Sequence, residues 1–126
     1  MVRPTIGQAI GPAVAGVAAP GEPTVEFAVE TPRGVKVPDV VWISETRAAQ
    51  IPDDAEASPV MPELVVEVLS RSNLQRQREE KIRLYLDGGA QEVWLCDADG
   101  RLTLYDAAGE RKTSALAPSF PKTIAS

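Results

Sequence analysis

The sequence predicts an α/β (α+β) fold, a mixed β-sheet with one principal helix after its central strand. A central strand is predicted over 63–69, because the run 64–69, apolar but for one residue, is typical of a strand buried on both faces. An amphipathic helix is predicted over 74–86, because apolar residues recur there at helical spacing and Gly88 and Gly89 follow. The apolar segment 92–96 predicts a second buried strand. Strand, helix and strand in this order indicate a crossover between two parallel strands.

The chain before this unit is predicted to form a hairpin after a weakly structured start. Residues 6–17 are rich in alanine, glycine and valine without a sustained period, so they predict a weak helix or an extended segment, followed by a loop at 20–23. Alternating apolar and polar residues predict strands over 24–30 and 35–43. A Thr-Pro-Arg-Gly turn joins the two strands into a hairpin.

The remaining elements are short. A helical turn is expected over 45–50, within a polar and turn-rich connection to the central strand. After the second buried strand, the segment 101–105 is predicted to pair back as a hairpin, and a weak strand follows at 111–116. The single domain 1–126 therefore divides into a weakly structured segment (1–23), a core (24–116) and a tail (117–126).

The composition excludes several classes of function. The chain has no histidine, which excludes histidine bases, triads built on histidine and histidine-ligated zinc. Its single cysteine, Cys96, has apolar neighbours and is expected in the core. No run approaches the roughly 20 apolar residues of a membrane span, and a secretory signal is not evident, so we expect a cytoplasmic protein without membrane contact. The net charge of −5 argues against binding nucleic acid through bulk charge.

Two carboxylates and one lysine occupy positions where apolar residues are expected. Glu67 is the only ionisable group within the run 64–69, and a carboxylate buried there needs a cation, a lysine, a metal ion or a proton as its partner. Asp39 shares one face of a predicted strand with valines on both sides. Lys81 lies on the helical stripe that should pack on the sheet, so its ammonium group either points inward or snorkels past the apolar face.

These three residues suit the hydrolysis of phosphodiesters. Two converging carboxylates repel each other, and a divalent cation such as Mg²⁺ neutralises them. A cation there would acidify a water, and the lysine would position that water or stabilise negative charge on phosphate. The alternative is structural. In that case Asp39 caps a bulge beside Pro38, and Glu67 forms an ion pair with Lys81.

The other charged residues are unevenly distributed. Basic residues outnumber acidic ones between 71 and 83, so an anionic partner is expected to bind there. An acidic cluster follows the predicted helical turn, and we expect it to be a solvated loop rather than a metal site. The basic residues are Arg71, Arg76, Arg78, Lys81 and Arg83, the acidic ones among them are Glu79 and Glu80, and the acidic cluster consists of Asp53, Asp54 and Glu56.

The segments VKVPDVVWIS, PELVVEVLSRSN and EEKIRLYLDGGAQEVWLCDADGRLTLY together resemble the Uma2 family, also called DUF820. This is a bacterial family of restriction endonuclease-like proteins in the PD-(D/E)XK nuclease superfamily. The shared pattern consists of Pro-Asp-Val, a strand that carries a glutamate, a helical lysine before Leu-Tyr, and Gly-Ala-x-Glu-Val-Trp-Leu, spread over about residues 24–106. The resemblance implies a restriction endonuclease-like fold and nuclease activity.

The resemblance also implies roles for individual residues. Asp39 and Glu67 would bind Mg²⁺ or Mn²⁺, with the backbone carbonyl of Val68 as a further metal ligand. The superfamily pattern places a lysine two residues after the glutamate, where this chain has Leu69. The family supplies the lysine from the following helix instead, and this position corresponds to Lys81.

Two functions of different classes follow. The first is a metal-dependent endonuclease that hydrolyses DNA, with Asp39, Glu67 and Lys81 as catalytic residues. The second is a non-catalytic module that keeps the fold and acts by self-association or protein interaction, which exposed tryptophans would favour. Open sheet edges predict a homodimer in either case. The expected DNA contacts are Arg71, Arg76 and Arg78, and the tryptophans are Trp42 and Trp94.

Overall fold

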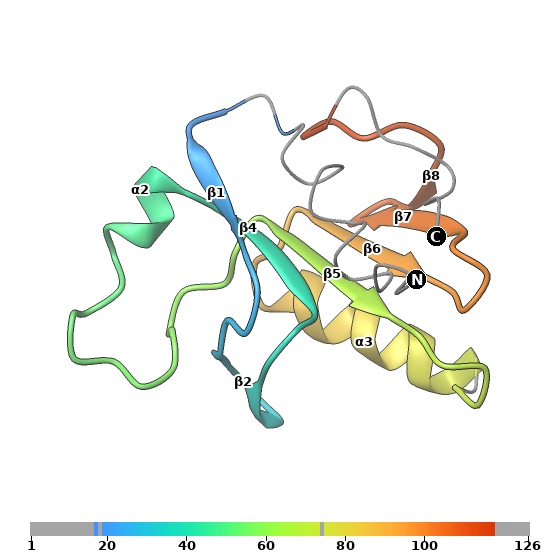
Figure 1. Cartoon of the computed structure of the whole chain (residues 1–126), viewed down its shortest axis with the longest axis horizontal. Coiled ribbons are helices and arrows are strands. Elements are labelled where there is room, and N and C mark those ends of the chain that lie inside the picture. Colours follow the sequence, from blue (N-terminus) through green and yellow to red (C-terminus); the bar gives the residue numbers. More distant parts are fainter. Residues whose placement is uncertain (1–16, 18, 74, 118–126) are drawn as a thin grey trace, which may run out of the picture.

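The structure, a computed structural model, describes residues 17, 19–73 and 75–117 (Figure 1). Among these residues, six strands form one sheet in the order β1-β4-β5-β6-β7-β8, and two more strands form a small sheet. Neighbours in the large sheet are antiparallel except for β5 and β6, which are parallel. The predicted mixed sheet with one principal helix after the central strand is confirmed. The elements are β1 (Gly21–Thr24), β2 (Val29–Thr31), β3 (Gly34–Lys36), β4 (Val40–Ser44), α2 (Glu45–Ala48), β5 (Leu64–Val68), α3 (Gln75–Asp87), β6 (Glu92–Cys96), β7 (Leu102–Asp106) and β8 (Gly109–Arg111).

The central unit of β5, α3 and β6 forms as the sequence predicts. The two strands are parallel, with Glu67 opposite Leu95. Helix α3 covers one face of the sheet (Figure 1), where Tyr85 is buried and Ile82 is half-buried. Helix α3 ends at Asp87, and two residues later Gly89 has a φ of +120°, which suits the end of a helix. Leu74, the first residue of the predicted helix, lies outside the described residues.

Both faces of the large sheet are buried, which explains the continuous apolar runs of its central strands. Alternate residues of each strand face different layers. The layer under α3 contains Val29, Val41, Met61, Val65, Leu69, Tyr85, Ala90, Val93 and Leu95. The opposite layer contains Val17, Val40, Trp42, Leu64, Val66, Trp94, Cys96, Leu102, Leu104 and Ala117.

The prediction of a loop at 20–23 is wrong for its last three residues, because β1 begins at Gly21. This strand lies at an edge of the large sheet and pairs antiparallel with β4. An edge strand tolerates proline, because one row of its N–H groups needs no ladder partner. A Cβ atom at Gly21 would lie 2.5 Å from the Ile43 carbonyl and 2.5 Å from the Trp42 ring, so glycine allows the close approach of the two strands.

The two strands predicted over 24–30 and 35–43 are both interrupted. The first is broken at Glu26, whose φ of 56° turns the chain out of the large sheet. The second is broken around Pro38, which cannot donate a ladder hydrogen bond, so β3 and β4 are separate strands. The predicted hairpin therefore exists only as β2 and β3, a small sheet of its own. The apolar face expected along 35–43 is also wrong, because Val35 and Val37 are exposed.

The C-terminal half agrees with the sequence except at its end. Strand β7 pairs with β6 as the predicted hairpin, and α2 is the helical turn expected over 45–50. The strand predicted at 111–116 is wrong: β8 ends at Arg111, and the segment 114–117 turns around the carboxylate of Glu92. This segment is held by side-chain acceptors rather than by a ladder.

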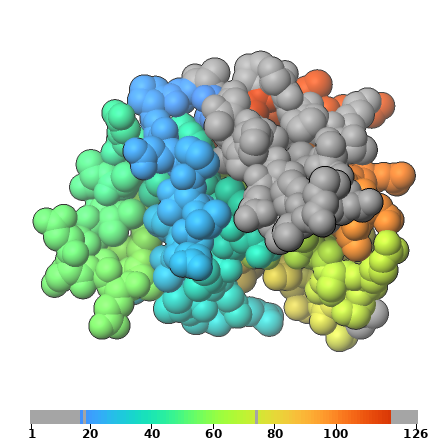
Figure 2. All heavy atoms as spheres, viewed as in Figure 1, coloured from blue at the N-terminus to red at the C-terminus, as the bar shows by residue number. Residues whose placement is uncertain are grey.

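The loop between α2 and β5 forms a lobe at one side of the molecule, drawn in green in Figure 2. Residues 1–16 and 18 of the predicted N-terminal segment, and 118–126 of the tail, lie outside the described residues. Within the described ranges, neither helix is long and apolar enough to cross a membrane.

Candidate active site

The register of β4 and β5 brings Asp39 and Glu67 together. Val40 lies opposite Val66 in this antiparallel pair, so the preceding residue, Asp39, comes opposite Glu67. The Oδ2 atom of Asp39 accepts a hydrogen bond of 2.7 Å from the backbone N–H of Val68. Asp39 is exposed, whereas Glu67 is only 7% exposed. One carboxylate of the pair is therefore open to solvent, and the other lies inside the protein.

Two side chains of α3 contact the two oxygens of the Glu67 carboxylate. The Tyr85 hydroxyl donates a hydrogen bond of 2.8 Å to Oε1, and Lys81 Nζ lies 3.6 Å from Oε2. Residues four apart share one face of a helix, so both side chains can reach the same group. Of the two orientations that the sequence left open for Lys81, the structure has its ammonium group turned toward Glu67, with the side chain still 36% exposed. Sequence reasoning gave Tyr85 no role, although its spacing from Lys81 on the same apolar stripe is the signal that identifies it.

The surroundings of Glu67 oppose the ionisation of its carboxyl group. Burial raises the pKa of the Glu67 carboxyl, the Tyr85 hydrogen bond and the Lys81 charge oppose this rise, and the negative charge of Asp39 adds to it. Burial and the adjacent Glu67 also raise the pKa of Tyr85, so its hydroxyl keeps its proton and donates. The pKa of Glu67 remains above its ordinary value, because burial and Asp39 raise it by more than Tyr85 and Lys81 lower it.

The raised pKa of Glu67 predicts how the stability of the metal-free protein depends on pH. The folded state binds this proton more tightly than the unfolded state, so the carboxyl stabilises the fold most below its ordinary pKa of 4.5. The contribution is lost as the pH rises through the raised value. The Glu67→Gln variant has no such group, so its free energy of unfolding should exceed that of the parent by a margin that grows with pH.

Urea unfolding in the presence of a chelator, from about pH 4 to about pH 8, measures this margin. Both proteins are followed by circular dichroism under identical conditions, which cancels the titration of all other groups. A margin that stays constant over the whole range would show that Glu67 titrates normally in the folded protein.

The oxygen donors at this site fit a hard divalent cation. Mg²⁺ is usually held by one or two carboxylates together with waters and substrate oxygens, and Asp39 and Glu67 supply two carboxylates close enough to interact. In the part of the chain that the structure describes, no group of three or more His, Cys, Asp or Glu side chains could hold a metal ion. The predicted backbone ligand, Val68, directly follows Glu67, and its N–H orients Asp39.

Each of the three arginines predicted to contact DNA has acidic side chains nearby. Arg71 forms an ion pair of 2.8 Å with Asp99. Arg76 lies 3.9 Å from Glu80 on the solvent side of α3 and is 79% exposed. Arg78 is half-buried and lines a pocket of about 250 Å³ together with Arg71 and Asp99. Acidic side chains thus accompany the arginines that the sequence singled out.

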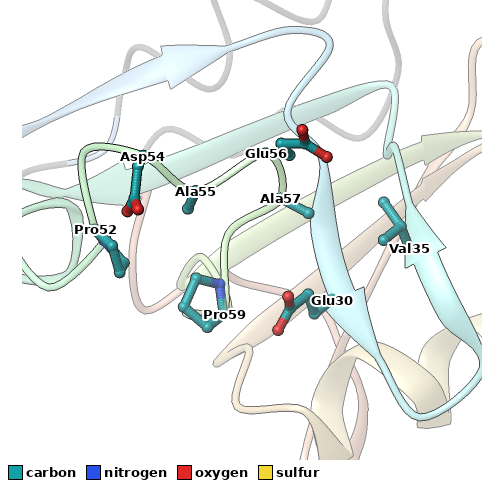
Figure 3. A pocket seen from close by; sticks show the side chains of 8 residues that line it. All are labelled: Glu30, Val35, Pro52, Asp54, Ala55, Glu56, Ala57 and Pro59. Atoms are coloured by element: carbon teal, nitrogen blue, oxygen red, sulfur yellow. The ribbon is translucent and has the colours of Figure 1, made fainter.

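The acidic loop cluster lies at a different place. Asp54 and Glu56 line a pocket of about 660 Å³ that also includes Glu30 of β2. Figure 3 shows these carboxylates set apart around the pocket and pointing in different directions. This arrangement agrees with the solvated loop that the sequence predicts.

Both tryptophans and the cysteine belong to the core. Trp42 and Trp94 are 3% and 0% exposed, so neither provides the exposed aromatic surface that would favour a module acting by self-association. Burial raises the pKa of the Cys96 thiol to about 11, which makes it an unreactive core residue, as expected.

Comparisons with known proteins agree with this fold. The family model described as "Uma2: Putative restriction endonuclease" matches residues 4–120. None of the curated proteins matches the chain. Among solved structures, it is similar to the "putative nuclease belonging to DUF820" from Anabaena variabilis ATCC 29413, with a TM-score of 0.64 and 20% sequence identity. The match covers 84% of this chain and 65% of the Anabaena chain, so the shared fold spans slightly less than two thirds of the latter. Because the family model covers nearly the whole sequence, the chain belongs to the Uma2 family.

Proposed function

We propose that this protein is a metal-dependent endonuclease that hydrolyses phosphodiester bonds in DNA. The observation that carries the proposal is the convergence of Asp39, which directly precedes β4, Glu67 of β5 and Lys81 of α3. A purely structural ion pair between Glu67 and Lys81 would not require the exposed Asp39 beside it, since a second carboxylate destabilises the pair. Membership of a nuclease family supports the same reading.

In this proposal, Asp39 and Glu67 hold one Mg²⁺ or Mn²⁺ ion, with the Val68 carbonyl as a further ligand. When bound, the ion lowers the pKa of a water and offsets charge on the phosphate. Tyr85 keeps Oε1 of Glu67 in place, which leaves Oε2 directed toward Lys81. The ammonium group of Lys81, whose side chain is 36% exposed, can reach a phosphate oxygen at the mouth of the site.

A cytoplasmic location and a homodimer, both expected from the sequence, belong to the same proposal. Strands β1 and β8 are the two edges of the large sheet and are open to pairing among the described elements. Light scattering gives the mass in solution and decides between one copy and two.

Replacing Lys81 with methionine tests the proposed role of the lysine. Methionine keeps most of the apolar stem but removes the charge, so we expect the rate of DNA cleavage to fall by about 10²-fold, the usual effect of losing one group that stabilises transition-state charge. Arg83→Met is the matched control, because Arg83 is an exposed cation of the same helix outside the site.

The measurement is the conversion of supercoiled plasmid to nicked and linear forms with Mg²⁺ or Mn²⁺, and with chelator as a blank. The parent and Arg83→Met should cleave at similar rates. A parent that leaves DNA intact with either ion would refute the proposed function, and equal rates for the parent and Lys81→Met would remove Lys81 from the mechanism.

A further inference from the structure

A groove of about 240 Å³ lies between the β2–β3 hairpin and α3, next to the candidate active site. In Figure 1 the hairpin projects from the large sheet beside α3, and Figure 2 shows a notch between the two at the lower edge of the molecule. Tyr85 and Lys81 line both the groove and the surroundings of Glu67, so the groove leads directly to the proposed reaction centre. Its other polar lining residues are Arg33, Lys36, Asn73, Gln77 and Glu80.

The charge of this groove is opposite to that of the protein as a whole. Arg33, Lys36 and Lys81 are cationic, and Glu80 is the acidic residue among the groove's lining. Glu80 itself has Arg76 nearby, at 3.9 Å. The chain carries a net charge of −5, so a groove with a surplus of positive charge stands out as a place where an anion would bind.

Hydrogen bonds hold the hairpin that carries Arg33 at its turn and at its base. At its turn, the Thr31 hydroxyl donates a 2.6 Å hydrogen bond to the Gly34 carbonyl and accepts one of 3.1 Å from the Arg33 N–H. At its base, the Glu30 N–H donates to the Ser58 carbonyl at 2.9 Å. A cation on a rigid turn loses little conformational freedom on binding, which favours its use as a contact.

The arginines suggested by the sequence are less suited to this task. Arg71 is neutralised by Asp99 at 2.8 Å, and Arg78 lines a pocket with Asp97 and Asp99. An anionic chain passing over them would meet these carboxylates. Arg33 and Lys36 of the hairpin are far from these arginines in the sequence. Only the folding of the chain brings the hairpin beside α3.

We propose that Arg33 and Lys36 bind the phosphodiester backbone of the DNA strand that enters the active site, along the groove between the β2–β3 hairpin and α3. Lys81 lies 3.6 Å from Glu67, and the two hairpin cations line the same groove from the β2–β3 side. The inference rests on the proposed function for the choice of DNA, and it adds the surface that positions the strand. Such contacts fix the register of the nucleic acid without reading its sequence.

The test is a binding measurement that does not depend on cleavage. All variants carry Glu67→Gln, and the anisotropy of a labelled DNA duplex is followed in chelator at several salt concentrations. The Arg33→Gln/Lys36→Gln pair should weaken binding by about tenfold and reduce the slope of log affinity against log salt by about 2, one unit for each phosphate contact. Circular dichroism confirms that each variant is folded.

The matched control is Arg83→Gln/Lys112→Gln, which changes the net charge by the same amount. Arg83 lines a separate groove between α3 and the β7–β8 hairpin, and Lys112 is exposed after β8. This pair should leave the slope close to that of the background. Equal losses for the two pairs would overturn the inference, because binding would then follow net charge alone.

The outcomes separate this inference from the proposed function. Cleavage is measured on proteins that keep Glu67. If the parent cleaves DNA, and Arg33→Gln/Lys36→Gln changes neither binding nor cleavage, the role proposed for the groove is refuted and the nuclease function stands. If the parent does not cleave but the hairpin pair specifically loses binding, the groove stands without catalysis. A parent that fails to bind DNA refutes both, and preference for an RNA duplex overturns the assignment to DNA.

Discussion

Replacing Glu67 with glutamine is expected to abolish DNA cleavage while the protein stays folded. Glutamine keeps the size of the side chain and can still accept the hydrogen bond from Tyr85, which is 2.8 Å long in the parent. It removes one of the two negative charges that would hold a divalent ion with Asp39. Losing several kcal/mol of charge stabilisation in the transition state corresponds to a rate reduction of about 10³-fold or more.

The same variant should be as stable as the parent, or more stable, at neutral pH in chelator, because a carboxylate with a pKa raised by burial is costly to ionise. Plasmid cleavage and urea unfolding on one protein preparation measure both properties. Cleavage at the parental rate would remove Glu67 from the reaction. A large loss of stability would instead assign it to the structural ion pair with Lys81.

Replacing Glu92 with leucine is expected to have the opposite effect and to destabilise the fold strongly. Glu92 is 3% exposed and accepts hydrogen bonds from Trp94 Nε1 at 3.0 Å and from the Ser114 hydroxyl at 2.6 Å. It also accepts from the backbone N–H groups of Ala115 and Leu116. Leucine removes the acceptor that these four groups share, and the segment 114–117 loses the carboxylate that ties it to the core.

We expect the free energy of unfolding to fall by about 3 kcal/mol or more, since each hydrogen bond to a charged acceptor contributes about 1.5–3 kcal/mol. Glu92→Gln, which keeps one oxygen acceptor, should lose less. Urea unfolding followed by circular dichroism measures both. A change of less than about 0.5 kcal/mol for Glu92→Leu would mean that the segment 114–117 is not held through this carboxylate.

These two glutamates show how far sequence reasoning reaches in this protein. Glu67 is recognisable because a lone charge in an apolar run breaks the pattern of a buried strand. Glu92 begins the next strand and has no such signature, because three of its four donors, the Ser114 hydroxyl and two backbone N–H groups, are more than twenty residues away. The sequence reveals a buried carboxylate when its immediate neighbours are apolar. It does not reveal one that is buried by segments distant in the sequence.

The N-terminal half shows a second limit. Alternation of apolar and polar residues correctly indicates extended chain, yet it does not tell which strand an extended segment will join. The segment beginning at Gly21 has the composition of a turn and becomes an edge strand, because Trp42 and Ile43 of β4 provide a surface that only glycine approaches so closely. The DNA contacts expected from Arg71, Arg76 and Arg78 stay a prediction; the structure adds that Arg71 and Arg76 each lie beside an acidic side chain, which their place in the sequence does not reveal.

The sequence by itself determined the strand–helix–strand unit from β5 to β6, the inward position of Glu67 and the place of Lys81 on the helical stripe that packs on the sheet. These features follow from periodicity within single elements, which is a local property of the chain. Only the tertiary structure decided that Asp39 stands opposite Glu67, that Tyr85 bonds to the same carboxylate, and that Arg33 and Lys36 face α3 across a groove. Each of these depends on the register or docking of two elements, which is set by the packing of the whole core.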